Sequence, residues 1–164
     1  MKPVSVRVQK LTRKMKTSGA IIRLRHGGSG PPLLLMHGNP LSHISWYKIA
    51  PRLAERYHVV MPDLRGYGYS SCPENDAKNE AYSKRAMAKD MIALMKSLGY
   101  QRFAVAGHDR GARVGYRMAL DHPEAMSCLV VLDIVLPKKN GFQVCRQLKT
   151  DPATCDMKVI LLSS

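Results

Sequence analysis

A tight turn between an apolar segment and a helical pattern is the feature that most constrains this chain. The residues Gly107-His108-Asp109-Arg110-Gly111 follow the apolar run 103–106 and precede a helical pattern over 112–120. Glycines at both ends of the turn let the backbone reverse closely from a strand into a helix. A strand, a tight turn and a helix in this order predict one unit of a parallel sheet covered by helices. Asp109 then stands at the tip of the turn.

An aspartate at this position indicates a particular kind of chemistry. A hydroxyl needs a base before it becomes nucleophilic, whereas a carboxylate is already anionic at neutral pH. A carboxylate suits displacement at a saturated carbon that carries a leaving group, such as a halide or an epoxide oxygen. The product is an ester on the protein, which water must then hydrolyse. The alternative is structural, because aspartate is also common as the N-cap residue of a helix.

Short apolar runs alternate with helical patterns along most of the chain. Strands are expected at 4–9, 20–25, 32–36, 58–61, 103–106, 128–134 and 158–162. Helices are expected at 46–56, 84–98, 110–120 and 141–149. Pro51 predicts a kink or a later start in the first of these helices. The alternation predicts the fold class α/β, a mostly parallel sheet with helices on both faces, formed by residues 1–164 as a single domain.

Composition excludes several classes of protein. The chain has 164 residues, of which 45% are apolar, as in a globular protein and not a disordered one. No apolar run reaches the roughly 20 residues that span a bilayer, and the first residues lack the apolar core of a signal peptide. The four cysteines show no C-x-x-C spacing. They are expected to be free thiols in a reducing cytoplasm, with neither a metal site nor a cofactor.

The net charge of +14 is concentrated near the N-terminus, where no acidic residue precedes Glu55. The basic residues of this region are Lys2, Arg7, Lys10, Arg13, Lys14, Lys16, Arg23 and Arg25. Contact with nucleic acid or an anionic membrane is one interpretation. A solvated pair of leading strands, with acidic partners elsewhere, is the other. The second is favoured, because no aromatic residue interleaves with the charges to stack on bases.

Further motifs occur in order before the turn. His37-Gly38-Asn39-Pro40 follows the apolar run 33–36, and Asp63-Leu64-Arg65-Gly66-Tyr67-Gly68 follows 58–61. Together with Gly107–Gly111 they resemble the N-terminal half of an α/β-hydrolase, whose central turn is the nucleophile elbow. The resemblance is to haloacetate (fluoroacetate) dehalogenases and their epoxide-hydrolase relatives, and it covers about residues 17–134. It implies a truncated α/β-hydrolase fold without the helical cap of that family.

The resemblance implies a role for the polar residues near the elbow. Asp109 would be the nucleophile, and Arg110 and Arg113 would hold a substrate carboxylate with their planar guanidinium groups. The backbone N–H groups of Asn39 and Arg110 would bind the oxyanion that forms during ester hydrolysis. Asp133 would be the acidic residue that orients a histidine. No metal and no cofactor is implied.

Each of these assignments has a structural alternative. Arg110 and Arg113 could form a surface pair that balances nearby aspartates, and Asn39 could be a simple turn residue. Asp133 could cap the loop that follows its strand. Three other residues near the motifs are expected to be structural: His37, His108 and Trp46.

The C-terminal part of the chain resembles a different family. Residues 130–164 resemble a fragment of a response-regulator receiver domain, in which an aspartate ends a strand and a proline–glycine loop leads into a helix. Asp133 corresponds there to the phosphoacceptor, but the acidic pair that holds the metal is missing. We interpret the chain as a chimera, whether natural, engineered or a product of sequence assembly. The receiver-like residues 135–164 would extend the sheet of the hydrolase-like residues 1–134.

These patterns support one function over two alternatives. The favoured function resembles haloacetate dehalogenation, with Asp109 displacing halide from a short 2-halo carboxylate, and an epoxide is the related substrate class. No histidine follows His122, so the family's water-activating base is missing and at most one turnover is expected. The alternatives are an inactive chimeric scaffold and, least favoured, a receiver-like signalling module. A small-molecule partner is expected, as is self-association through uncovered apolar surface.

Overall fold

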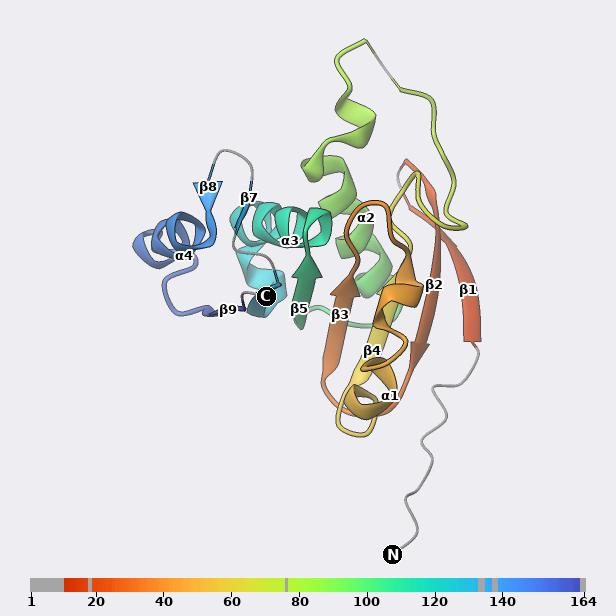
Figure 1. Ribbon diagram of the computed structural model, residues 1–164, viewed down its shortest axis with the longest axis horizontal. Helices are drawn as coiled ribbons and strands as arrows, with labels where there is room; N and C mark the ends of the chain where they lie inside the picture. Colours follow the sequence, from red (N-terminus) through yellow and green to blue (C-terminus); the bar gives the residue numbers. More distant parts are fainter. Residues whose placement is uncertain (1–10, 18, 76, 133–134, 137–138, 163–164) are drawn as a thin grey trace, which may run out of the picture.

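Seven strands form one twisted sheet in the computed structural model, which describes residues 11–17, 19–75, 77–132, 135–136 and 139–162 (Figure 1). In spatial order the strands are β1 (Leu11–Lys16), β2 (Ile21–Gly27), β4 (His58–Pro62), β3 (Pro32–Met36), β5 (Phe103–His108), β6 (Met126–Leu132) and β9 (Lys158–Leu161). The β1–β2 and β2–β4 pairs are antiparallel, and every pair from β4 to β9 is parallel. The predicted α/β class with a mostly parallel sheet is confirmed.

Helices cover both faces of this sheet. The helical segments are η1 (His43–Trp46), α1 (Ala50–Leu53), η2 (Glu80–Tyr82), α2 (Lys84–Ser97), α3 (Arg110–Asp121), η3 (Pro123–Ala125) and α4 (Gly141–Thr150). A short hairpin of β7 (Val135–Leu136) and β8 (Lys139–Asn140) precedes α4. Buried residues of α2 and α3 pack on one face, and η1 and α1 lie on the other (Figure 1).

Strand periodicity divides the core into two layers. Along β3, Leu34 and Met36 join the larger cluster under α2 and α3, whereas Leu33 and Leu35 join the smaller cluster with Trp46. Successive side chains of a strand point to opposite faces, so a buried strand needs apolar residues at every position. Trp46 is 5% exposed and packs in this smaller cluster, as expected for a core anchor.

One expected helix is divided in the structure, and one strand was not expected. The helix expected at 46–56 is divided into η1 and the short α1, because Pro51 occupies the first turn of α1, where its missing N–H costs nothing. The structure also contains β1 at the edge of the sheet, which the sequence patterns did not predict. Its residues alternate weakly and its basic side chains are exposed, as on many edge strands. The strand expected at 4–9 lies outside the described residues.

The C-terminal segment continues the sheet. Strand β9 pairs in parallel with β6, with Cys128 opposite Lys158 and Val131 opposite Leu161. This is the position expected from the strand–helix–strand order, in which a crossover helix joins two parallel strands of one sheet. Strand β9 is the last strand of the described sheet, and Ile160 is 47% exposed. Ile160 and Leu162 help to line an apolar groove of about 410 Å³ on the face of the sheet that carries Trp46.

Three structural expectations concern cysteines, metals and membranes. All four cysteines are free. Within the described ranges, no three histidine, cysteine or carboxylate side chains are grouped to hold a metal ion. Among the same residues, none of the helices combines the length and the apolar character that crossing a bilayer requires.

Candidate active site

The turn between β5 and α3 places Asp109 in a backbone conformation that few side chains adopt. Asp109 has φ 46° and ψ −109°, and it occupies the N-cap position of α3 without making a side-chain capping bond. A non-glycine residue at positive φ is strained and persists only where its surroundings enforce it. The N-cap alternative therefore does not explain the carboxylate, which makes no capping bond.

Close backbone packing enforces this turn. A Cβ atom built on Gly107 would lie 2.5 Å from the backbone of Gly111, and one on Gly111 would lie 2.3 Å from the Met36 carbonyl oxygen. Only glycine fits at both positions, so the start of α3 can sit directly against the end of β3. The loop after β3 consequently runs beside the Asp109 carboxylate.

The Asp109 carboxylate is bound from two sides. The backbone N–H of Asn39 donates to Oδ2 at 2.8 Å, and Nη2 of Arg113 donates to Oδ1 at 2.9 Å. Burial acts to raise the pKa of Asp109, but the backbone N–H groups of Asn39 and Arg110 and the charge of Arg113 outweigh it. The pKa of Asp109 is therefore below its ordinary value, and the carboxylate is ionised at neutral pH. Its side chain is 23% exposed, so a small molecule can reach it.

The two arginines expected at the site occupy different positions. Arg113 forms an i,i+4 ion pair with Asp109, whereas the guanidinium of Arg110 lies over the ring of Tyr67, 5.5 Å from its centre. In both arginines the Nε atom is buried and has no hydrogen-bond partner among the described residues. The Asp109 carboxylate already has its hydrogen bonds, so these unpaired N–H donors are free to bind a second anion.

Two residues near Asp109 were not identified as functional from the sequence. The hydroxyl of Tyr67 donates to Oδ1 of Asn39 at 2.8 Å and so supports the loop whose N–H faces Asp109. Lys84 begins α2, and its pKa is lowered by burial and then by the charges of Arg110 and Arg113, while Asp109 raises it. Lys84 is therefore a third cation of this region. Its only signal in the sequence is its place at a helix start, which does not reveal what faces it.

A buried ion pair holds the loop that carries Tyr67. Arg65 donates from Nε to Oδ2 of Asp90 at 2.6 Å and from Nη2 to Oδ1 at 2.7 Å, and from Nη1 to the Ala81 carbonyl at 2.6 Å. The hydroxyl of Thr17 donates to Oδ1 of Asp90 at 2.5 Å. Since Asp90 is fully buried and Arg65 is 4% exposed, the pair fixes the segment after β4 against α2.

Five of the six histidines of the chain contact described groups other than Asp109. His37 is buried, its Nδ1 lies 2.8 Å from the Gly38 carbonyl, and its Nε2 accepts from the Leu64 N–H at 3.0 Å. Burial lowers the pKa of His37, and both ring nitrogens are committed to the backbone, so its expected structural role fits the geometry. The other described histidine partners are His58 for His26, Asp63 for His43, Tyr100 for His58 and Glu124 for His122. His108 precedes Asp109 and is exposed.

The structure thus brings Asp109, Asn39, Arg110 and Arg113 together. Asp133, the remaining residue predicted to be catalytic, lies outside the described residues. The geometry is suited to an anionic nucleophile whose ester would have backbone N–H donors on its carbonyl oxygen.

Comparisons with known proteins match most of the chain to one fold family. A family model for the alpha/beta hydrolase fold matches residues 31–150. Fluoroacetate dehalogenase from a Burkholderia species is 55% identical over 109 residues, covering 66% of this chain and 36% of that protein. Soluble epoxide hydrolase from Corynebacterium sp. (strain C12) is 41% identical over 108 residues, with the same coverage of 66% and 36%. The chain therefore spans about a third of the length of these curated relatives.

Solved structures agree with this assignment. Epoxide hydrolase A from Mycobacterium thermoresistibile has 36% sequence identity and a TM-score of 0.71, over 75% of this chain and 39% of that one.

The family model also continues through residues 135–150, which the sequence patterns had assigned to a receiver-like fragment. The receiver resemblance and the chimeric junction gain no support from these matches.

Proposed function

The chain belongs to the alpha/beta hydrolase fold family, and we propose that its Asp109 displaces halide from a short 2-halo carboxylate. The observation that carries the proposal is the strained Asp109, whose Oδ2 is held 2.8 Å from the Asn39 N–H beside an arginine-rich surface. The similarity to a fluoroacetate dehalogenase and to epoxide hydrolases supports an ester-forming nucleophile at this position.

The first step needs no base. An oxygen of the Asp109 carboxylate attacks the saturated carbon, a C–O bond forms, and the carbon–halogen bond breaks with its electron pair leaving on the halide. Oδ1 is the favoured attacking atom, because Oδ2 is engaged by the Asn39 N–H. Arg113 would transfer its hydrogen bond from Oδ1 toward the substrate carboxylate and so bring the carbon next to the nucleophile.

The second step would use the same backbone donors. Once Oδ1 is esterified, Oδ2 becomes the carbonyl oxygen, and attack of water on Cγ places negative charge on it. The N–H groups of Asn39 and Arg110 are positioned to bind that charge. The attacking water needs a base. Both ring nitrogens of His37 are hydrogen-bonded to the backbone, and Nδ1 of His43 lies 2.7 Å from Oδ1 of Asp63. In a preparation of these 164 residues we therefore expect the ester to persist and turnover to stop after one event.

A halo acid suits the site better than an epoxide. Arg110, Arg113 and Lys84 together present positive charge near Asp109. A substrate carboxylate would pair with that charge through bidentate hydrogen bonds, whereas a neutral epoxide gains nothing from it. Two alternatives remain as outcomes of the test: an inactive scaffold, which forms no ester, and a receiver-like module, which would be phosphorylated on Asp133.

The experiment is intact-mass measurement after incubation with fluoroacetate or chloroacetate, with the modified peptide then mapped. We expect one carboxymethyl group per chain on Asp109 and release of one halide. Asp109→Asn should abolish the adduct, and Arg113→Gln should slow its formation about tenfold or more, because a charged hydrogen-bonded contact contributes about 1.5–3 kcal/mol. Styrene oxide serves as the neutral comparison and should react more slowly.

Controls separate this reaction from chemistry at the free thiols. Cys72 is exposed and can be alkylated by reactive halides, so only an adduct that maps to Asp109 counts. Arg52→Gln removes an exposed charge on α1 and should leave the rate unchanged. A folded wild-type protein without any Asp109 adduct would favour the scaffold. Repeated turnover that survives substitution of each histidine would contradict the single-turnover mechanism.

The free thiols fit a reducing compartment, and we propose the cytoplasm as the location.

A further inference from the structure

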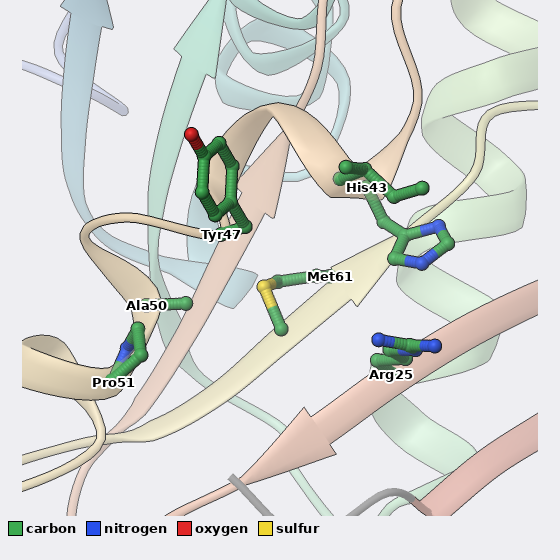
Figure 2. A pocket seen from close by; sticks show the side chains of 7 residues that line it. Arg25, His43, Tyr47, Ala50, Pro51 and Met61 are labelled. Carbon is green, nitrogen blue, oxygen red and sulfur yellow. The ribbon is translucent and has the colours of Figure 1, made fainter.

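A cavity with two polar side chains in its lining lies beneath η1 and α1, on the sheet face opposite α2 and α3. It has a volume of about 330 Å³. Its lining residues are Arg25, His43, Ile44, Tyr47, Ala50, Pro51 and Met61 (Figure 2). Asp109 and the residues that bind its carboxylate do not line it. The cavity is therefore a site apart from the nucleophile.

His43 is held in one orientation by a buried carboxylate. Its Nδ1 lies 2.7 Å from Oδ1 of Asp63, and its backbone N–H donates to the same oxygen at 2.8 Å. Asp63 is fully buried and also accepts from the Tyr69 N–H at 3.1 Å. An ionised carboxylate only accepts hydrogen bonds, so Nδ1 carries the proton. In the neutral tautomer with its proton on Nδ1, Nε2 is an acceptor.

That acceptor has no hydrogen-bond partner among the described residues. His43 is 4% exposed, and its Nε2 is buried without a hydrogen bond among the described residues. A buried polar atom without a partner is costly, and such atoms commonly mark a place where a ligand or ordered water completes the bond. In Figure 2 the imidazole ring of His43 lies above the Arg25 side chain, across the polar end of the cavity.

Arg25 places a positive charge at the same end of the cavity. It lies on β2 opposite Met61 of β4, and its Nε is also buried without a hydrogen-bond partner among the described residues. None of the described lining residues is a carboxylate, and Asp63, which holds His43, accepts hydrogen bonds from His43 and Tyr69. Arginine only donates, whereas the Nε2 atom of His43 accepts. The cavity thus presents a cationic donor beside a neutral acceptor.

The remaining walls are apolar. Tyr47, Ala50, Pro51 and Met61 line the part of the cavity away from the two polar side chains, and Ile44 completes the lining. A ligand that fits must place an anionic acceptor on Arg25, a hydroxyl donor on His43 and a hydrocarbon body against Met61. We infer that this cavity binds a small 2-hydroxy carboxylate with an apolar side chain, its carboxylate on Arg25 and its hydroxyl donating to Nε2 of His43.

Matched acids test the two contacts separately. Mandelate has the carboxylate, the hydroxyl and an apolar ring, and phenylacetate is the same acid without the hydroxyl. By titration calorimetry the wild-type chain should bind mandelate about fivefold or more tightly than phenylacetate, the ratio expected for one neutral hydrogen bond. Arg25→Gln should weaken both acids about tenfold or more. Arg52→Gln removes a neighbouring charge that does not line the cavity and should change neither.

His43→Asn isolates the acceptor. The amide nitrogen of asparagine can take the place of Nδ1 and keep the bond to Asp63, whereas nothing replaces Nε2. Mandelate and phenylacetate should then bind with equal affinity. If this variant does not fold, the wild-type imidazole nitrogens can be followed by NMR. The Nε2 resonance should shift on adding mandelate and much less on adding phenylacetate.

Several outcomes would overturn the inference. One is failure of the folded wild-type chain to bind either acid at millimolar concentration. Another is mandelate affinity that survives Arg25→Gln but is lost in Arg113→Gln, which would place the acid at Asp109. Equal affinities of the wild-type chain for the two acids, or identical Nε2 shifts, would remove His43 from the site.

Discussion

Replacing Asp90 by asparagine should strongly destabilise the protein. Asp90 accepts three hydrogen bonds, two from Arg65 at 2.6 and 2.7 Å and one from Thr17 at 2.5 Å. The amide keeps one acceptor oxygen and turns an N–H₂ group toward a donor. Arg65, which is 4% exposed, loses its counter-ion. Removing one partner of a buried ion pair costs about 3–5 kcal/mol of unfolding free energy.

Urea denaturation followed by circular dichroism measures this cost. With a urea dependence of about 2 kcal/mol per molar, the midpoint of Asp90→Asn should fall by about 1.5–2.5 M. Asp156→Asn removes an exposed carboxylate and should change the unfolding free energy by less than about 0.5 kcal/mol. The comparison therefore separates the buried pair from the general effect of net charge.

The double variant Arg65→Met, Asp90→Leu tests the cause. Since no charge is left buried, it should be more stable than Asp90→Asn alone, by about 1 kcal/mol or more. The reasoning is refuted if Asp90→Asn lies within about 1 kcal/mol of the Asp156→Asn control. It also fails if the double variant is no more stable than the single one, because the loss would then come from packing.

Three further perturbations follow from the contacts. Gly38→Ala would place a Cβ 2.8 Å from Cβ of Asp109, so the Asn39 N–H must move and adduct formation on Asp109, measured by mass spectrometry, should slow about tenfold. The side-chain hydrogen bond from Arg85, together with Arg117, lowers the pKa of Asp121 from 3.8 to about 2. The ionised carboxylate therefore stabilises the fold above about pH 4, and this stabilisation is lost as the pH falls toward 2. Because Arg85 is 59% exposed, the wild-type advantage over Asp121→Asn should be about 1 kcal/mol at pH 6 and vanish near pH 2 in urea titrations. Ile160 is 47% exposed on β9, and light scattering should show concentration-dependent association that Ile160→Lys reduces; a wild-type monomer at all concentrations would contradict this.

The local sequence was enough to predict most of the elements and the tip of the elbow. The strand 32–36, the helix beginning at Lys84 and the turn at Asp109 depend on apolar periodicity, a Ser83 cap and closely spaced glycines, all of which act within a few residues. The position of β9 beside β6 also followed from the order of elements, because parallel strands need a crossover. The short α1 and the edge strand β1 were missed or misplaced, since tertiary packing outweighs weak local preference there.

The partners of the functional side chains were decided only by the tertiary structure. Asn39 and Asp109 are seventy residues apart in the chain, and their 2.8 Å contact exists because β3 and β5 are neighbours in the sheet. The ion pair of Arg65 with Asp90 depends in the same way on where the loop after β4 meets α2. Arg25 shows most clearly what the sequence does not reveal. The sequence placed Arg25 in a solvated basic segment, whereas in the fold its side chain lines a cavity together with His43. Periodicity specifies which face of a strand a residue occupies, but the order of the strands determines what covers that face.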